Sequence, residues 1–225
     1  MSSVAGLRVA REFAAACRAL VREYPVAKWW PARSRFEVMV GAILVQNTRW
    51  TNVAAAIRVL RARRCMTPQA IQALHGGQLQ EFIRSAGCQS IKARRLRSLA
   101  LQIGQLGDLR GMASMDTDAL RDALLSVHGV GAETADAILC FAFDRPVFIA
   151  DQYARRWLER MGFVAGRAAQ NYAQCQGRVS ALLDGVRVDY RDLHAGIVLH
   201  GQGVCGRAPR CAECCINNLC KYEFK

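Results

Sequence analysis

The sequence predicts an all-α protein, and three observations support this fold class. Apolar residues recur at helical spacing, as in residues 36–44, where Phe36, Met39, Val40, Ile43 and Leu44 occupy one face. No run shows the alternation of a half-buried strand, and the apolar stretch 145–150 is interpreted as a buried connector because nothing nearby could pair with it. No low-complexity tract, repeat or long linker interrupts the pattern.

The expected helices follow one another with short loops, and capping residues mark several boundaries. Thr67 is a natural N-cap with Pro68 at the first helical position, and Gly87, Gly107 and Gly162 are stop residues. A further helix is expected to start at a cap, Asp116 or Thr117. The expected ranges are 36–46, 51–64, 66–74, 78–87, 90–107, 115–127, 133–143, 151–162 and 187–205.

Composition indicates a globular protein with a polyanionic partner. About half of the 225 residues are hydrophobic (52%), which suffices for a sizeable core, and 31 Lys+Arg against 18 Asp+Glu give a net charge of +13. This surplus favours nucleic acid as partner, the alternative being a basic protein without one. The sequence contains no apolar run of about eighteen residues, so no membrane-spanning helix is expected. Arg8, Arg11 and Glu12 interrupt any signal-peptide core, so we expect an intracellular protein with reduced thiols.

The stretch "SVHGVGAETADAIL", residues 126–139, predicts two helices joined by a tight glycine turn. Gly129 and Gly131 permit a sharp turn and close approach of a ligand to the backbone, and Ala135 allows the helices to pack closely. The N–H groups that open the second helix suit a phosphate. We therefore expect DNA-backbone contacts here, the alternative being an ordinary helix corner. The residues concerned are His128, Gly129, Val130, Gly131, Glu133 and Thr134.

Five of the ten cysteines fall between Cys205 and Cys220. Four of them have the spacing Cys-x5-Cys-x2-Cys-x5-Cys: Cys205, Cys211, Cys214 and Cys220. Four thiolates in so short a loop can hold a tetrahedral metal ion or an iron–sulfur cluster. Zinc sites usually have two closely spaced pairs of ligands, and this stretch has only one Cys-x2-Cys pair. The spacing therefore favours a cluster over zinc, and a site without metal remains the third alternative.

The hairpin followed by "PVFIAD" resembles the helix-hairpin-helix and Gly-Pro-Asp signature of the endonuclease III superfamily of DNA glycosylases. The resemblance covers about residues 25–222 and implies two lobes: a six-helix lobe over 33–147, and a second lobe formed by 1–32 and 148–225. It also implies a structural 4Fe–4S cluster on the four cysteines, although the first gap is one residue shorter than is usual. Cys215 is an extra thiol that could compete with Cys214.

The resemblance assigns the chemistry to Asp151, which lies twenty residues after Gly131. Members of the superfamily that also cut the strand carry a lysine two residues after the second hairpin glycine, where this chain has Glu133. A carboxylate cannot form a Schiff base, and no lysine lies between Lys92 and Lys221. We therefore expect a monofunctional enzyme in which Asp151 stabilises the sugar cation and orients water. Capping of the next helix is the plainer role for Asp151.

The stretch "KWWPARSRFEVMVGAILVQNTRW" most resembles bacterial 3-methyladenine DNA glycosylases of the endonuclease III type. That branch implies a base pocket at Trp29, Trp30, Pro31 and Trp50, with Trp29 and Trp50 sandwiching the flipped base. It also implies that Gln46, next to Asn47 on the DNA side, fills the gap left in the duplex. Indole faces attract an electron-poor alkylated purine. A structural cluster is the plainer interpretation of the tryptophans, and members of this branch can lack the cluster cysteines.

The sequence thus predicts a monomeric glycosylase acting on double-stranded DNA that contains damaged bases, in a bacterial cytoplasm or nucleoid, without membrane contact. The expected substrates are alkylated purines, 3-methyladenine and 7-methylguanine. One alternative is the same fold acting on oxidised pyrimidines or on mismatched adenine or thymine, with or without strand cutting. A second alternative is a non-catalytic protein that binds damaged DNA.

Overall fold

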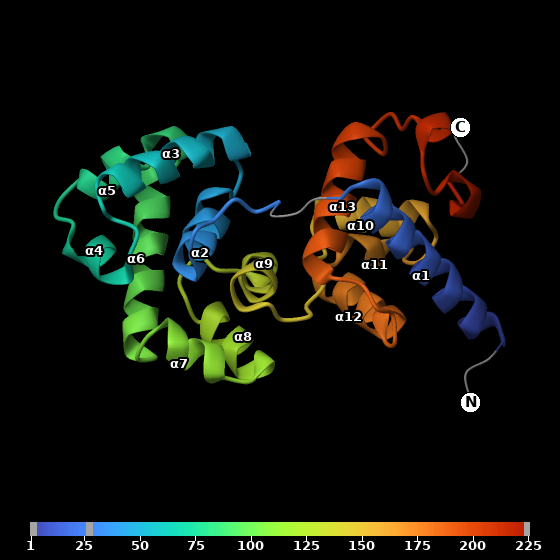
Figure 1. The fold of residues 1–225 in the computed structure, drawn as a ribbon, viewed down its shortest axis with the longest axis horizontal. Helices are drawn as coiled ribbons and strands as arrows, with labels where there is room; N and C mark the ends of the chain where they lie inside the picture. The colour runs from blue at the N-terminus through green and yellow to red at the C-terminus, as the bar shows by residue number, and fades with distance from the viewer. Residues whose placement is uncertain (1–3, 26–28, 223–225) are drawn as a thin grey trace. The chain divides into compact units, whose positions relative to one another are not determined.

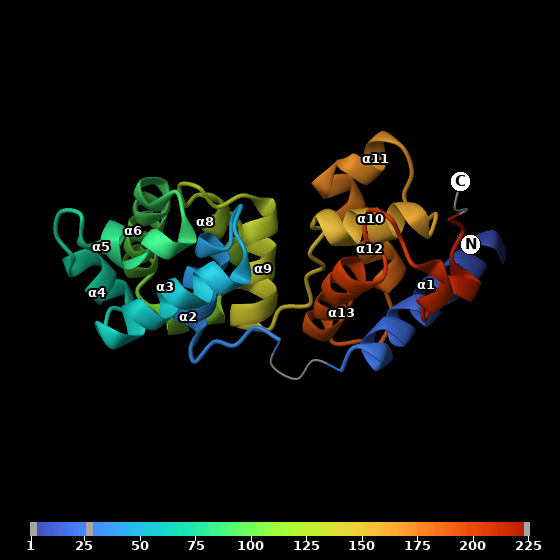
Figure 2. The ribbon, with the colours of Figure 1, turned by 90° about the horizontal axis from the view of Figure 1, so that it is seen from above.

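The computed structural model describes residues 4–25 and 29–222, and within these ranges the chain is helical and contains no strand. It divides into two compact units, one formed by Trp30–Arg145 and the other by residues 1–29 together with 146–225. Figures 1 and 2 label the helices of each unit. Every helix in the described ranges is too short or too polar to span a bilayer. The sequence had suggested boundaries at 33 and 147 in place of 30 and 145.

The unit Trp30–Arg145 contains eight α-helices whose starts follow local capping chemistry. Ser34, Thr67, Asp108 and Asp116 each accept a hydrogen bond from a backbone N–H of the helix that they precede. Gly107 follows α6 with φ of 92°, a conformation that glycine tolerates best. The elements are α2 (Arg35–Leu44), α3 (Trp50–Ala62), α4 (Pro68–Ala73), α5 (Gln78–Phe82), the 3-10 turn η1 (Arg84–Ala86), α6 (Gln89–Gln105), α7 (Leu109–Ser114), α8 (Thr117–Leu125) and α9 (Ala132–Phe143).

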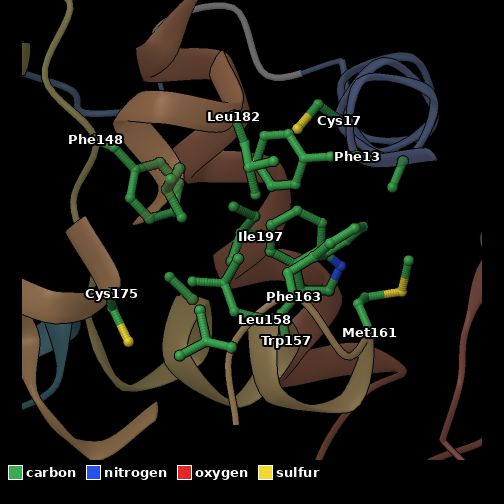
Figure 3. Packing of buried hydrophobic residues seen from close by; sticks show 14 of the residues in the cluster. Phe13, Cys17, Phe148, Trp157, Leu158, Met161, Phe163, Cys175, Leu182 and Ile197 are labelled. Atoms are coloured by element: carbon green, nitrogen blue, oxygen red, sulfur yellow. The ribbon is translucent and has the colours of Figure 1, made fainter. Parts of the chain in front are cut away.

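The other unit joins the two ends of the chain around an aromatic core (Figure 3). Phe13 of α1 lies 5.0 Å from Phe163 and 5.8 Å from Trp157 between ring centroids. Leu182 and Ile197 complete the core from two further helices. The elements are α1 (Val4–Glu23), α10 (Gln152–Arg160), α11 (Arg167–Gln170), α12 (Tyr172–Leu183), α13 (Tyr190–Gly203) and the 3-10 turns η2 (Cys211–Glu213) and η3 (Asn217–Leu219).

The predicted helices are present, but several boundaries differ and four helices had not been predicted. The helix expected over 36–46 ends at Leu44, and the one expected over 78–87 becomes α5 and η1, divided at Ile83. Asp116, and not Thr117, caps α8. These helices are α1, α7, α11 and α12, and the last three each start after a capping or glycine residue. The connector expected at 145–150 is confirmed, with Phe148, Ile149 and Ala150 buried.

The hairpin helices α8 and α9 are braced by an ion pair as well as by apolar packing. Asp136 of α9 is fully buried and accepts two hydrogen bonds from Arg121 of α8, at 2.7 and 3.2 Å. Leu124 of α8 and Ala135 of α9 are both buried, and the two helices contact each other. On its other side α9 contacts α2. This burial fixes the direction in which the N-terminus of α9 leaves the glycine turn.

Substituting Arg121→Leu should destabilise the protein by about 3 kcal/mol, because the buried carboxylate of Asp136 would lose its cationic partner. Chemical denaturation followed by circular dichroism measures the loss. Arg8→Leu is the matched control, since Arg8 pairs with Glu12 on an exposed helix face and should leave the transition unchanged. Equal stability of Arg121→Leu and the wild type would show that the pair does not brace the hairpin.

Candidate functional site

The turn between α8 and α9 has the geometry expected of a backbone-binding hairpin. Gly129 has φ of 85°, in the region that favours glycine, and the N–H of Val130 donates to Val127 O at 3.0 Å. Gly131 is the N-cap of α9, with an extended backbone. The first N–H groups of a helix have no acceptor in a preceding turn, so they are available to an anion. His128 and Glu133 are exposed beside this turn, whereas Val130 is buried.

Gln46 lies against this turn from the loop after α2. Its Nε2 donates to Gly129 O at 3.2 Å and to Thr134 Oγ1 at 2.9 Å. Its Oε1 accepts from Nη1 of Arg95 on α6. The next residue, Asn47, is exposed and has φ of 56°. The structure therefore brings together the predicted gap-filling glutamine and the predicted backbone-binding turn, and it adds Arg95, which the sequence had not indicated.

The four residues predicted for the base pocket lie in two different units. Trp30 lies edge-to-face with Trp50 at 5.4 Å between centroids and 5.0 Å from Phe141, and its ring packs on the backbone of Gly41. Trp29 lies edge-to-face with His194 at 5.6 Å, in the unit that contains α13. Pro31 is exposed. The aromatic cluster of Trp30, Trp50 and Phe141 is therefore the part of the predicted pocket that the structure brings together within one unit.

Asp151 caps α10, the plainer role that the sequence had suggested for it. Its Oδ1 accepts from the N–H of Ala154 at 2.8 Å. Burial raises the pKa of this carboxyl to about 6, against the opposing pull of the Ala154 and Tyr153 N–H groups and of the arginines at 155 and 156. The group is thus a carboxylate at pH 7 that can exchange a proton in a physiological range.

The two lysines in the described ranges both have partners. Nζ of Lys92 donates to Leu44 O at 2.8 Å and to Ala86 O at 2.7 Å, and burial lowers the pKa of this buried side chain. Lys92 thereby joins the end of α2 to the turn before α6. Nζ of Lys221 lies 3.7 Å from the Glu12 carboxylate. Lys28 and Lys225 lie outside the described residues.

The four spaced cysteines line one cavity, which encloses about 370 Å³ of atom-free space including solvent at its mouth. Trp157, Met161 and Ile216 form part of its apolar wall. Nη1 of Arg160 donates to Cys205 Sγ at 3.1 Å, and Nε2 of His200 lies 3.8 Å from Cys214 Sγ. Cys215, the extra thiol, is not among the lining residues.

The residues that line this cavity have the chemistry that an iron–sulfur cluster requires. The indole N–H of Trp157, a residue that lines the cavity, is buried without a hydrogen-bond acceptor in the described residues. Four thiols, a buried donor and an apolar wall fit an iron–sulfur cluster with four cysteine ligands.

Comparison with known proteins identifies the family. Residues 40–179 match the model described as HhH-GPD superfamily base excision DNA repair protein. The protein named "Putative DNA repair glycosylase MJ1434" from Methanocaldococcus jannaschii is 38% identical over 204 residues, covering 89% of this chain and 92% of that protein. The chain belongs to the HhH-GPD superfamily of base excision DNA repair proteins. The resemblance to the endonuclease III superfamily is confirmed.

Other HhH-GPD relatives carry several names. Endonuclease III of Haemophilus influenzae is 30% identical over 194 residues, which cover 85% of this chain and 86% of that protein. The structure of a 3-methyladenine DNA glycosylase of H. pylori bound to 1,N6-ethenoadenine superposes with a TM-score of 0.72 at 24% identity, covering 86% of this chain and 97% of that chain. This superposition confirms the expected all-α fold of the helix-hairpin-helix glycosylases.

Sequence reasoning missed the structural roles of three residues because these roles depend on distant contacts. Arg95 and Lys92 belong to an arginine-rich helix where nothing in the local pattern separates buried from exposed cations. His200 follows the helical pattern of α13 and contacts Tyr24 and Cys214. Only its place five residues before Cys205 could have drawn attention to it.

Gly129→Ala should lower the stability of the hairpin by about 1–3 kcal/mol, because the residue has a positive φ and its new Cβ would come within 2.4 Å of the Arg95 side chain. Gly131→Ala is the matched control, since an added Cβ there meets no atom within 4 Å and φ is −94°. Thermal unfolding measures both variants, and equal unfolding temperatures would contradict this assignment.

Proposed function

We propose that this protein is a monofunctional DNA glycosylase that hydrolyses the N-glycosidic bond of alkylated purines, namely 3-methyladenine and 7-methylguanine, in damaged duplex DNA. Glu133 in the first turn of α9 carries the monofunctional part of the proposal, because a carboxylate there cannot attack the sugar. The engagement of Lys92 and Lys221 with other groups supports it. In this proposal water takes the place of an amine as the nucleophile.

In the proposed reaction Asp151 acts as a carboxylate on the sugar carbon C1′ of a flipped nucleotide. The C1′–N bond breaks and its electron pair stays with the departing base, which leaves a cationic sugar that the negative charge stabilises. Water adds to C1′, and its proton passes to Asp151 and then to solvent. An N-alkylated purine already carries positive charge and leaves as a neutral base, so no strong general acid is needed. The pKa of Asp151 near 6 suits this proton transfer.

The aromatic residues support an alkylated purine as substrate. Indole and phenyl faces attract an electron-poor ring, at about 1–3 kcal/mol per stacked base. Trp30, Trp50 and Phe141 offer such faces in one unit and Trp29 in the other. The H. pylori 3-methyladenine DNA glycosylase, solved with 1,N6-ethenoadenine bound, has the same fold. Relatives named endonuclease III make strand cutting the principal alternative.

We further propose that Cys205, Cys211, Cys214 and Cys220 hold a 4Fe–4S cluster. The cluster would tie the C-terminal loop to α10 and α13 and would supply no step of base hydrolysis. Arg160 and His200 would donate hydrogen bonds to its thiolate ligands, since both already lie against cysteine sulfur atoms.

Asp151→Asn should lower base release from methylated DNA by at least about a hundredfold, because the amide can neither carry negative charge nor accept the water proton. Asparagine caps helices as well as aspartate does, so α10 should remain intact. Chromatography of released bases measures the loss, and binding to a duplex with a tetrahydrofuran abasic analogue measures what is retained. Asp189→Asn, which alters the cap of α13 in the same way, should leave release unchanged. Retained turnover in Asp151→Asn would overturn the role of Asp151.

The single-turnover rate of base release should rise about tenfold per pH unit up to pH 6 and level off above it, because the carboxylate form is required and the pKa of Asp151 is about 6. A flat rate profile from pH 4.5 to 7.5 would contradict the assignment.

The raised pKa also means that ionising Asp151 opposes folding above the ordinary value of 3.8. Asp151→Asn should therefore unfold at an equal or higher temperature than the wild type at pH 7, and lose this advantage below pH 3.8.

A further inference from the structure

The side-chain amide of Gln46 is held by two segments that are far from it in the sequence, α6 and the hairpin turn. Arg95 of α6 donates to its oxygen, while its nitrogen donates to the carbonyl of Gly129 and to the hydroxyl of Thr134. Gln46 itself lies in the loop after α2, which ends at Leu44, so its backbone is not held by that helix. The amide is thus oriented by its partners and not by its own helix.

The partners also fix which way round the amide stands. A guanidinium only donates hydrogen bonds, so the Gln46 atom facing Arg95 is the oxygen. A backbone carbonyl only accepts, so the atom facing Gly129 is the nitrogen. The reversed amide would place two donors against each other and two acceptors against each other. Replacing Arg95 would remove the contact that holds the oxygen end.

Arg95 is held in turn by the shape of the glycine turn. An added Cβ at Gly129 would lie 2.4 Å from Cγ and Nε of Arg95 and 2.5 Å from its Cδ. The stem of the arginine therefore occupies the space that any larger residue would need. Its Nε is buried without a hydrogen-bond acceptor in the described residues, so close packing over the turn, and not a second hydrogen bond, locates this part of the side chain.

We infer that Arg95 is a positioning residue that pre-orders Gln46 on the hairpin turn, so that the backbone-binding turn and the gap-filling glutamine act as one rigid element. This inference rests on the proposed function, since it assumes that the protein binds DNA with a nucleotide extruded. Ordering a free glutamine side chain costs conformational entropy. The hydrogen bonds order the side chain in the free protein, so binding does not have to order it. The network should therefore favour binding to DNA that has a gap for Gln46 to fill.

The competing role for Arg95 is direct contact with a phosphate. A phosphate ligand would strengthen binding to damaged and undamaged duplexes alike, with a steeper salt dependence. A positioning residue would instead change the preference for damaged DNA, and only while Gln46 is present. The two roles therefore differ in a measurable ratio of affinities and in their dependence on Gln46.

The test measures the affinities of the full chain for a duplex with a tetrahydrofuran abasic analogue and for the same duplex undamaged. Arg95→Met should lower the ratio of the two affinities about tenfold, and Gln46→Ala should lower it equally. In a double-mutant cycle Arg95→Met should have no further effect on Gln46→Ala. Arg94→Met is the matched control, because it removes an exposed neighbouring arginine with the same loss of charge, and the ratio should stay constant. Thr134→Val, which removes another contact of Gln46, should also lower the ratio if Arg95→Met fails to fold.

An undiminished effect of Arg95→Met on the Gln46→Ala background would overturn the inference, as would equal loss on both duplexes. A wild-type protein without preference for the abasic duplex would overturn it as well. The readout requires no base release. Failure to release methylpurines would count against the proposed substrate, while a normal cycle on the abasic duplex would still support the role of Arg95.

Discussion

Burial of helix α9 is the constraint on which the rest of the structure depends. One side packs on α2 and the other on α8, where the carboxylate of Asp136 is neutralised by Arg121 inside the protein. Because α9 cannot rotate or slide without exposing this pair, its N-terminus is fixed at the glycine turn. Its C-terminus leads through the buried connector to Asp151. One helix thus fixes the anion-binding turn, and the chain continues from it to the segment that carries the proposed catalytic carboxylate.

Around the turn, polar groups are arranged before any ligand is present. Gly129 supplies the conformation, Arg95 fills the space that the missing side chain leaves, and Gln46 uses both ends of its amide. Pre-ordered groups bind with less loss of conformational entropy than free ones do. Asp151 in the other unit is also ordered without a ligand, because N–H groups of α10 hold its carboxyl in one place. Burial raises the pKa of this carboxyl to about 6.

Local patterns predicted the features that depend on neighbours in sequence. The glycine turn, the caps at Thr67 and Asp151, and the buried connector follow from spacing and residue type, and all are present. Four helices do not follow from the predicted pattern: α7 and α11 are short, and α1 and α12 are longer helices outside the ranges where apolar spacing predicted one. Arg95 could not have been found in this way, because its role arises only when three distant segments meet. For the same reason the sequence could not predict that the adjacent residues Trp29 and Trp30 pack in different units.

Water-driven release of an alkylated purine is tested most directly on methylated duplex DNA, by measuring free bases and strand breaks in the same reaction, with and without alkali. We predict free 3-methyladenine and 7-methylguanine, and strand breaks only after alkali, because Glu133 cannot form a Schiff base. Breaks without alkali would contradict the monofunctional mechanism. Release of oxidised pyrimidines or mismatched bases in the absence of methylpurine release would contradict the proposed substrate.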